Sequence, residues 1–169
     1  MKYAVVDVET TGFSVEHDEI VEIAVVSVQG GNIRERWSSL VRPSSEVRLR
    51  TIKVHGLDND TLAAAPRRER LIPRLIDLLH GVVLVEHNLD GFDSRFLSKF
   101  LGASPWSSSL NTLAVAKRSI PNLPGYDLGS VAAHFGVRPW AQHQAEADAL
   151  ATAEVLLRLL PWLSPSPEA

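Results

Sequence analysis

The chain has 169 residues, of which 45% are hydrophobic, and a net charge of −3; this fits one compact domain and provides no general attraction to nucleic acid. It contains no cysteine, so disulfides, thiolate catalysis and cysteine zinc sites are excluded. No apolar run approaches the ~18 to 20 residues that cross a bilayer, and the first predicted strand begins at Lys2, so we expect a cytoplasmic protein without a secretory leader or membrane anchor.

Three strands are predicted at the start of the chain, over residues 2–8, 19–29 and 33–43. The Gly30-Gly31-Asn32 break between the second and third is a hairpin signal. We therefore expect these strands to form an antiparallel meander.

Helices and a buried strand are predicted for the rest of the chain. Leu71, Ile72, Leu75, Ile76 and Leu79 have helical spacing and predict a helix with Pro73 in its first turn. The further predicted elements are a strand over 82–87, a helix over 93–102 that ends at Gly102, and helices near 112–119, 127–135 and 145–160.

This order of elements predicts an α/β fold with helices on both faces of a mixed sheet. We expect a single domain over residues 1–162. Residues 163–169 have the composition of a disordered tail or a linker stub.

Two acidic residues, Asp7 and Glu9, interrupt the first predicted strand. Residues two apart project from the same face of a strand, and no Lys or Arg lies nearby in sequence to neutralise them. A divalent cation would compensate this charge. The alternative is that both acids lie beyond the end of the strand in solvent, with Glu9 capping the turn made by Thr10, Thr11 and Gly12.

Further acids and a histidine occur where later elements begin. Asp93 precedes Phe96, Leu97 and Phe100 at helical offsets, so it belongs to the inward face of its helix, although a capping role is an alternative. Asp90 is interpreted as a turn or cap residue. His143 and Asp148 are five residues apart and would diverge by roughly 140° on one helix. We therefore place His143 in the loop before the helix and Asp148 in its first turns.

The segments DVETTG, VEHNLDGFD and HQAEAD together resemble the DEDDh branch of the DnaQ-like 3′-to-5′ exonucleases, which includes proofreading subunits and trimming enzymes. The resemblance spans nearly the whole chain and implies a ribonuclease H-like, five-stranded mixed sheet. Two positions depart from common members: three residues separate the HN and FD pairs, and Asn111 stands where an Asp is frequent. The five residues that give the family its name correspond to Asp7, Glu9, Asp93, His143 and Asp148.

The resemblance implies a two-metal mechanism with Mg²⁺ or Mn²⁺. Asp7 would bridge both ions, Glu9 and Asp148 would complete the first site, and Asp93 would hold the second, largely through water. The ions would flank the scissile phosphate. His143 would act as the general base that takes the proton from the attacking water.

The resemblance also implies substrate contacts, partners and products. Hydrolysis would release nucleoside 5′-monophosphates from single-stranded or frayed 3′ ends, with DNA favoured and RNA as an alternative substrate. A polymerase or a repair protein is the expected partner. Arg48, Arg50 and Lys53 are either phosphate contacts or solvated surface charges. The residues expected near the terminal nucleotide are Thr10, Thr11, Gly12, Phe13, His55 and Asn88; for Phe13, packing in the core is the alternative.

Two other functions are compatible with parts of the pattern. DVETT is similar to the start of haloacid-dehalogenase phosphatases, in which Asp7 would be a nucleophile; that interpretation leaves His143 without a role. A non-catalytic module that binds nucleic acid or a polymerase is the second alternative. Release of mononucleotides that depends on metal would distinguish the three.

Overall fold

A five-stranded mixed sheet forms the centre of the protein, which we describe from a computed structural model covering residues 1–88, 91–138, 140–141 and 143–163. The strands lie in the order β3-β2-β1-β4-β5. The pairs β1–β2 and β2–β3 are antiparallel, whereas β1–β4 and β4–β5 are parallel. The strands are β1 (Lys2–Thr10), β2 (Ile20–Gln29), β3 (Asn32–Leu40), β4 (Val83–Glu86) and β5 (Ser108–Asn111).

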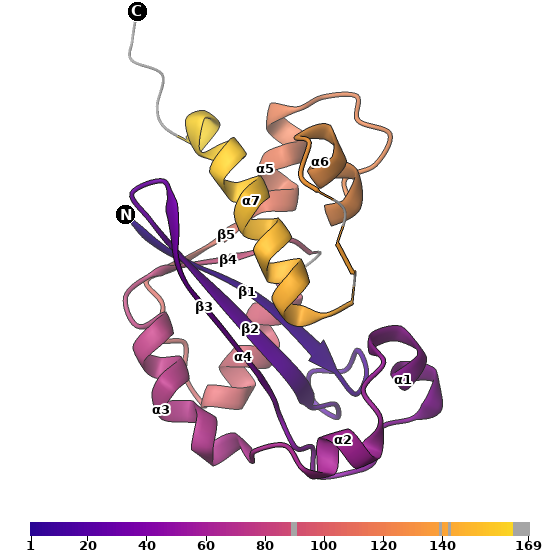
Figure 1. The fold of residues 1–169 in the computed structure, drawn as a ribbon. Coiled ribbons are helices and arrows are strands. Elements are labelled where there is room, and N and C mark those ends of the chain that lie inside the picture. The colour runs from indigo at the N-terminus through magenta and orange to yellow at the C-terminus, as the bar shows by residue number, and fades with distance from the viewer. Residues whose placement is uncertain (89–90, 139, 142, 164–169) are drawn as a thin grey trace, which may run out of the picture.

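Seven helices are assigned among the described residues, and they cover both faces of the sheet (Figure 1). They are α1 (Leu49–His55), α2 (Asn59–Ala63), α3 (Arg68–Leu79), α4 (Phe92–Leu101), α5 (Thr112–Ser119), α6 (Leu128–His134) and α7 (Ala145–Leu163). The predicted α/β fold with a mixed sheet is thereby confirmed.

The alternation of side chains along β1 assigns the two cores. Ala4, Val6 and Val8 pack in the core that includes residues of α3 and α4, whereas Val5 packs in the core that includes residues of α7. Because residues two apart share a face, Asp7 and Glu9 continue the face of Val5. The α7 helix lies across this face in Figure 1. The two acids therefore lie at the end of the strand that faces the start of α7.

Local signals in the sequence account for several ends of elements. Gly30 and Gly31 adopt φ values of 60° and 74° in the β2–β3 hairpin, as the turn type requires. Gly102 ends α4 with a φ of 71°. Asn111 accepts hydrogen bonds from the amides of Leu113 and Ala114 and so caps α5. The departure at Asn111 thus has a structural role in this chain.

Several predicted boundaries were wrong. Strand β1 continues to Thr10, and β3 ends at Leu40 rather than at residue 43. Helix α3 begins at Arg68, so Pro73 lies in its second turn. Helix α7 continues through Pro161 to Leu163, so this proline lies two residues before the end of the helix. Leu163 is therefore helical, and residues 164–169 of the predicted tail lie outside the described residues.

Helices α1 and α2 and strand β5 were not predicted by residue range. Each has only four to seven residues, too few to show a period. Asp90, interpreted as a turn or cap residue, lies outside the described residues. Among the helices that the structure describes, none has the length and apolar character needed to cross a membrane.

Candidate active site

Asp7 and Glu9 lie inside β1 rather than beyond its end, because the strand continues to Thr10. Both pair with residues of the neighbouring strand β2, Asp7 with Ala24 and Glu9 with Glu22. The alternative that these acids lie in solvent beyond the end of the strand was therefore wrong. Their side chains are half-buried at the carboxyl end of a central strand, which is where ligands bind in open α/β sheets.

Asp93 lies in the first turn of α4 and is 4% exposed. Its Oδ1 accepts a hydrogen bond of 3.0 Å from the backbone amide of Val8, which lies between Asp7 and Glu9 in β1. Its Oδ2 accepts a hydrogen bond from Nδ2 of Asn88. The inward direction predicted for Asp93 is confirmed, and the Val8 contact joins α4 to the acidic end of β1.

Asp148 and His143 lie at the start of α7. Asp148 is buried in the first turn of the helix, whereas His143 is exposed in the preceding loop with a φ of 61°. The backbone amide of His143 donates a 2.8 Å hydrogen bond to Oδ2 of Asp148. Both predicted placements are confirmed. A positive φ is uncommon for a residue other than glycine and occurs often at functional sites.

Glu22 and Trp140 also reach this cluster, although sequence reasoning missed them. Glu22 lies opposite Glu9 in the β1–β2 pair, and its Oε2 accepts a hydrogen bond from the amide of Ala145 at the start of α7. The indole N–H of Trp140 donates to Oδ1 of Asp148. The available signal for Glu22 was one acid within the apolar run of β2; Trp140 had no signal in the sequence.

Burial and mutual repulsion make Asp7, Glu9 and Asp93 harder to ionise than isolated carboxyl groups. Burial raises the pKa of Asp7 well above its ordinary value, and the charges of Asp93 and Asp148 raise this pKa further. Burial, followed by the charge of Asp148, raises the pKa of Glu9 to about 7. Burial and the charge of Glu86 raise the pKa of Asp93 to about 8, against the lowering effect of the Val8 hydrogen bond. Like charges held together in this way are stabilised when a cation binds.

A divalent cation fits this set of side chains. Ligand atoms of Glu9, His143 and Asp148 lie within 4.8 Å of one another, and carboxylate oxygens are the ligands that Mg²⁺ prefers. Within the described part of the chain, the salt bridges of Lys and Arg involve only Glu35 and Glu154. Among the residues that the structure describes, the acids of the cluster form no ion pair with a basic side chain.

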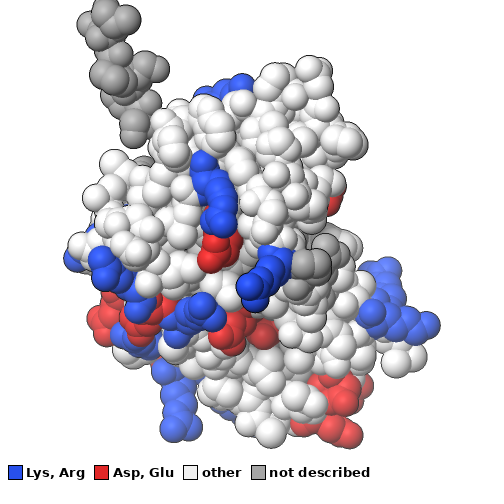
Figure 2. Space-filling model, turned by 45° about the horizontal axis from the view of Figure 1, so that its top comes forward, with Lys and Arg blue, Asp and Glu red and all other residues white. Residues whose placement is uncertain are grey.

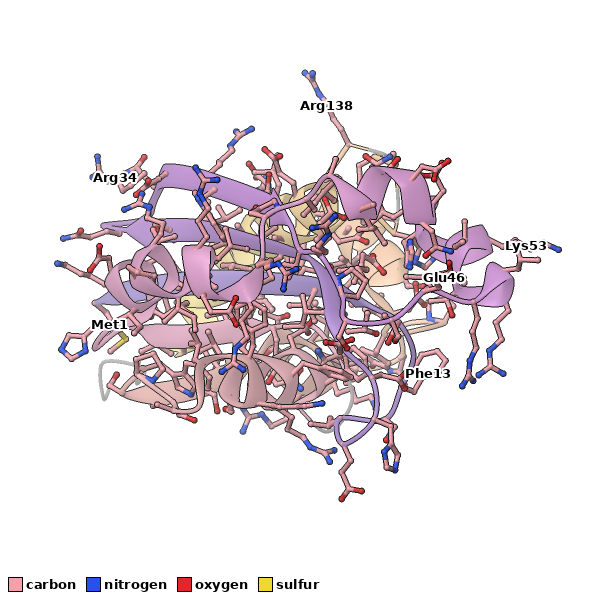
Figure 3. The ribbon with its side chains drawn as sticks, turned by 90° about the horizontal axis from the view of Figure 1, so that it is seen from below. Met1, Phe13, Arg34, Glu46, Lys53 and Arg138 are labelled. Atoms are coloured by element: carbon pink, nitrogen blue, oxygen red, sulfur yellow. The ribbon has the colours of Figure 1, made fainter. Side chains whose placement is uncertain are left out.

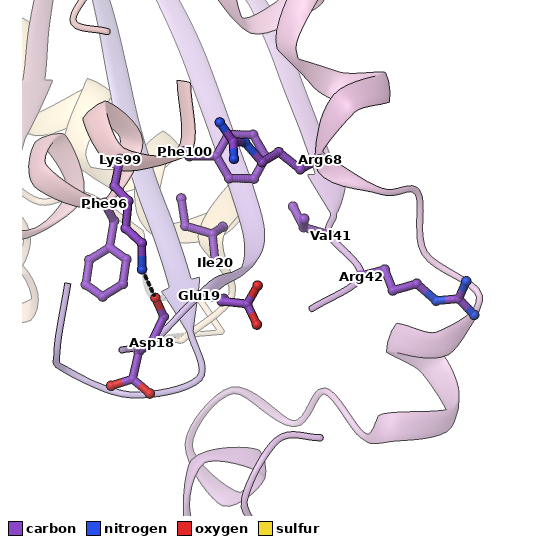
Figure 4. A pocket seen from close by; sticks show the side chains of 9 residues that line it. All are labelled: Asp18, Glu19, Ile20, Val41, Arg42, Arg68, Phe96, Lys99 and Phe100. Carbon is purple, nitrogen blue, oxygen red and sulfur yellow. Dashed lines mark hydrogen bonds between the residues drawn. The ribbon is translucent and has the colours of Figure 1, made fainter. Parts of the chain in front are cut away.

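The loop after β1 is built around the side chain of Asp18. Its carboxylate accepts hydrogen bonds from Oγ1 of Thr11 at 3.0 Å and from the amide of Ser14 at 2.9 Å. A Cβ atom at Gly12 would lie 2.5 Å from Oδ2 of Asp18, so this close approach requires glycine. Lys99 of α4 donates to the carbonyl oxygens of Glu16 and Asp18, and Figure 4 shows the second of these bonds. Helix α4 thus carries Asp93 and also holds this loop in place through Lys99.

Phe13 projects from this loop into solvent and is 90% exposed, so the alternative that it packs in the core was wrong. Its ring centroid lies 6.3 Å from that of Phe92. Figure 3 shows Phe13 and Lys53 at the end of the molecule opposite Met1 and Arg34. A hollow of about 190 Å³ lies beside it, between β1 and α1, and is lined by Glu9, Gly12, Phe13, Thr51, Val54 and His55.

His55 is a buried polar group at the base of this hollow. Its Nδ1 accepts a 3.1 Å hydrogen bond from the amide of Leu57, and its Nε2 has no partner in hydrogen-bonding geometry among the described residues. Burial lowers the pKa of His55, although the nearby carbonyl of Thr10 partly opposes this. A neutral imidazole that already accepts through Nδ1 carries its proton on Nε2. The Nε2–H of His55 is therefore a buried donor beside the Thr10 carbonyl, without a partner in hydrogen-bonding geometry among the described residues.

The other predicted substrate residues differ in what they can offer. Thr10 donates through Oγ1 to the carbonyl of Gly12. Asn88 is engaged with the side chains of Glu86 and Asp93 and with the amide of Phe92. Asn88 as a substrate contact therefore stays a prediction. The basic residues Arg48, Arg50 and Lys53 are exposed on or just before α1.

Comparisons with known proteins agree over nearly the whole chain. The sequence model of the RNase T family, described as exonuclease, matches residues 4–156. DNA polymerase III subunit epsilon from Aquifex aeolicus (strain VF5) is 32% identical over 161 residues, covering 94% of this chain and 80% of that relative. DNA polymerase III PolC-type from Thermotoga maritima is 35% identical over 162 residues, but this chain spans only 12% of its length.

Solved structures show the same fold. Exonuclease X, determined in complex with 5′ overhanging duplex DNA, has a TM-score of 0.77 at 24% identity, with 95% of this chain and 92% of that chain covered. A structure of exonuclease I has a TM-score of 0.82 at 17% identity, with 96% of this chain and 43% of that chain covered. The ribonuclease H-like arrangement implied by the DEDDh resemblance is thus confirmed. With the match over residues 4–156 and the Aquifex relative, these findings show that the chain belongs to the RNase T family of exonucleases.

Proposed function

We propose that this protein removes nucleoside 5′-monophosphates stepwise from the 3′ ends of nucleic acid, preferentially DNA, with two Mg²⁺ or Mn²⁺ ions as cofactors. The observation that carries the proposal is the convergence of Asp7, Glu9, Asp93 and Asp148 at one end of the sheet, where their charges oppose one another. Such a cluster stabilises a fold poorly but is well suited to bind cations. Membership of an exonuclease family supports the proposal.

Each acid has a proposed role in holding the cations. Asp7, at the centre of the cluster, would contact both; Glu9 and Asp148 would hold the first, and Asp93 the second. When bound, the cations would stabilise negative charge on the attacking and leaving oxygens of a phosphodiester. The Val8 amide would keep Asp93 oriented, and Trp140 and the amide of His143 would do the same for Asp148.

His143 is proposed as the general base. It is exposed in a loop, and its imidazole lies within reach of Glu9 and Asp148. A neutral imidazole could take the proton from the attacking water while the ordered Asp148 holds the loop through the His143 amide. The left-handed backbone at His143 directs the residue out of the helical path that follows it.

The hollow beside Phe13 is proposed to receive the terminal nucleotide. Phe13 would stack on a base, the N–H of His55 would donate to the sugar, and the exposed arginines of α1 would contact phosphate. On the face seen in Figure 2, basic and acidic side chains are interspersed. This face therefore presents no continuous basic surface to the backbone of a nucleic acid. Exonuclease X was solved with DNA and the Aquifex relative is a polymerase subunit, which supports DNA as substrate and a polymerase as partner.

The direct test uses end-labelled substrates with the purified protein. Single-stranded DNA, RNA, matched duplex and 3′-mismatched duplex are each incubated with Mg²⁺, Mn²⁺ or EDTA. We expect loss of mononucleotides from the 3′ end in both metals and none in EDTA. Single strands and mismatched ends should react faster, since unstacking a matched pair costs about 1.4 kcal/mol.

Two results would contradict the proposal. Undiminished activity in EDTA, or digestion from the 5′ end, would exclude the proposed chemistry. Tight binding of nucleic acid without hydrolysis in either metal would favour the non-catalytic module. The phosphatase alternative predicted membership of a different family and is not supported by the family match.

Replacement of His143 by Ala should reduce turnover by about 10²- to 10⁴-fold, as is typical when a general base is lost. Mn²⁺ affinity, measured by the EPR signal of free Mn²⁺, should be nearly unchanged. Replacement of the exposed His17 by Ala is the matched control and should alter neither. A parallel loss of Mn²⁺ affinity would instead make His143 a metal ligand, because its imidazole lies close to Glu9 and Asp148.

Replacement of Phe13 by Ala should weaken substrate binding without destabilising the protein. The ring is 90% exposed, so its removal costs little packing, whereas stacking on a base contributes about 1 to 3 kcal/mol. In Ca²⁺, which binds oxygen ligands, we expect the Kd of a labelled oligonucleotide to rise about 5- to 150-fold, the equivalent of that energy. Phe13→Trp should retain binding. Unchanged affinity in Phe13→Ala would exclude base stacking by this residue.

A further inference from the structure

Glu86 is a buried acid to which the proposed mechanism gives no role. It is the last residue of β4 and is 3% exposed. In the described part of the chain no Lys, Arg or His forms a salt bridge with it. Burial of an unpaired carboxylate is costly unless hydrogen bonds or a nearby cation compensate it. Its position beside Asp93 suggests which compensation applies.

Three hydrogen bonds hold the Glu86 carboxylate. Oε2 accepts from the amide of Ser94 at 3.1 Å and from Nδ2 of Asn88 at 3.2 Å, and Oε1 accepts from Oγ of Ser94 at 3.1 Å. The Ser94 amide belongs to the first turn of α4, whose N-cap Gly91 has no side chain to offer. Glu86 therefore also caps α4.

Asn88 connects Glu86 to Asp93. Its Nδ2 donates to Oε2 of Glu86 and to Oδ2 of Asp93, so both N–H bonds of the amide have carboxylate acceptors. Its Oδ1 accepts from the amide of Phe92 at 3.1 Å, which determines the orientation of the amide group. The Asp93 carboxylate is thus held between the Val8 amide on one oxygen and Asn88 on the other.

We propose that Glu86 is a positioning residue for the cation held by Asp93: it orients Asp93 through Asn88, and its negative charge increases the affinity of that site for a divalent cation. This inference rests on the proposed function, because it takes Asp93 as a metal ligand. The charge of Glu86 already acts on Asp93: burial is the largest cause of the raised pKa of Asp93, and the charge of Glu86 is the second. A divalent cation would convert this repulsion into attraction for both carboxylates.

Glu86→Gln separates the charge from the hydrogen bonds. In the variant, the amide oxygen can take the place of Oε2 of Glu86 and still accept from the Ser94 amide and from Nδ2 of Asn88. The new N–H donor can bond to Oγ of Ser94, because that hydroxyl can donate instead to the carbonyl of Gly91, 3.0 Å away. The geometry of the wild type is therefore retained and only the negative charge is lost. Glu86→Ala removes both, and Ser94→Ala removes one hydroxyl while leaving Glu86 charged and bonded to Asn88.

The experiment measures Mn²⁺ binding by EPR and thermal unfolding in EDTA for the wild type and the three variants. For Glu86→Gln we expect one Mn²⁺ site to weaken by about 10- to 100-fold, the usual effect of losing an outer partner of a metal ligand, with an unfolding temperature in EDTA equal to or above that of the wild type. Ser94→Ala should keep the Mn²⁺ affinity. Glu86→Ala should lose both Mn²⁺ affinity and thermal stability.

Wild-type Mn²⁺ binding in Glu86→Gln would overturn the role of the charge, and wild-type binding in Glu86→Ala as well would overturn the whole proposal and leave Glu86 as a cap of α4 only. Equal weakening in Ser94→Ala and Glu86→Gln would also overturn it, because a loosened helix would then explain both. If the wild type itself bound no Mn²⁺, the proposed function would fail together with this inference. If the wild type binds Mn²⁺ at two sites but the variants do not give the expected results, only this inference fails and the proposed function stands.

Discussion

Replacement of Asp7 by Asn should abolish nearly all nuclease activity and yet leave the metal-free protein as stable as the wild type or more stable. The folded protein disfavours the charged form of Asp7, because burial and then the charges of Asp93 and Asp148 raise its pKa. A neutral amide of the same shape relieves this repulsion in EDTA. The same change removes the carboxylate that we place against both cations.

Thermal unfolding with and without Mn²⁺ measures both effects. In the wild type, Mn²⁺ at a hundredfold excess over its Kd should add about 2.7 kcal/mol to the free energy of unfolding; in Asp7→Asn the gain should be much smaller. Asp77→Asn, the same substitution at an exposed site on α3, is the control and should behave as the wild type. A clear loss of stability of Asp7→Asn in EDTA would show that Asp7 serves the fold rather than a metal.

The stability of the wild type should depend on pH in opposite directions with and without metal. In EDTA, the free energy of unfolding should fall as pH rises from about 5 to about 8.5. The folded-state pKa values of Asp7, Glu9 and Asp93 are raised, to about 7 for Glu9 and about 8 for Asp93. Acids with raised pKa values favour the folded state while protonated. This contribution is fully present below the unfolded pKa, near 4, and is lost as pH rises through the folded pKa values.

The size of the effect is limited by coupling. One pKa unit corresponds to about 1.4 kcal/mol, but the acids titrate as a set, so we expect the total fall to be smaller than the sum of the separate shifts. With saturating Mn²⁺ the slope should reverse, because the ligands must be deprotonated to bind a cation. Urea unfolding at several pH values, in EDTA and in Mn²⁺, measures both slopes.

A double variant, Asp7→Asn with Glu9→Gln, is the control for this pH series. It removes two of the raised carboxylates and should flatten the slope in EDTA. Stability that rises with pH in EDTA, as it does for acids in ordinary salt bridges, would contradict the description of this cluster as mutually repulsive. A slope in the double variant equal to that of the wild type would assign the pH dependence to other groups.

The sequence by itself determined the elements with clear periodicity and the direction of the main acidic side chains. The two-residue repeat placed Asp7 and Glu9 on one face of β1, and the helical offsets of Phe96, Leu97 and Phe100 placed Asp93 inward. The five-residue separation of His143 and Asp148 assigned one to a loop and the other to a helix. These predictions succeeded because strand and helix geometry repeat over distances that lie within one segment.

Only the tertiary structure decided the short elements and the partners of the acids. Strand β5 has four residues, and it is defined by pairing with β4 rather than by its own composition. Helices α1 and α2 are too short to be stable alone and form in the context of the folded chain. The extension of β1 to Thr10 is defined by pairing with β2, and it excluded the alternative that Asp7 and Glu9 lie in solvent beyond the end of the strand.

The contacts around the acids depend on residues that are distant along the chain. Glu22 meets Glu9 only through the register of the β1–β2 pair, and Trp140 meets Asp148 only through the path of the loop before α7. In the sequence, Glu86 is a single acid near the end of a predicted strand. Its proximity to Asp93 follows from the position of α4 in the fold. The chain thus encodes which side chains are acidic and where they point, whereas packing decides how closely their charges approach, because Coulomb energy depends on separation and burial in three dimensions.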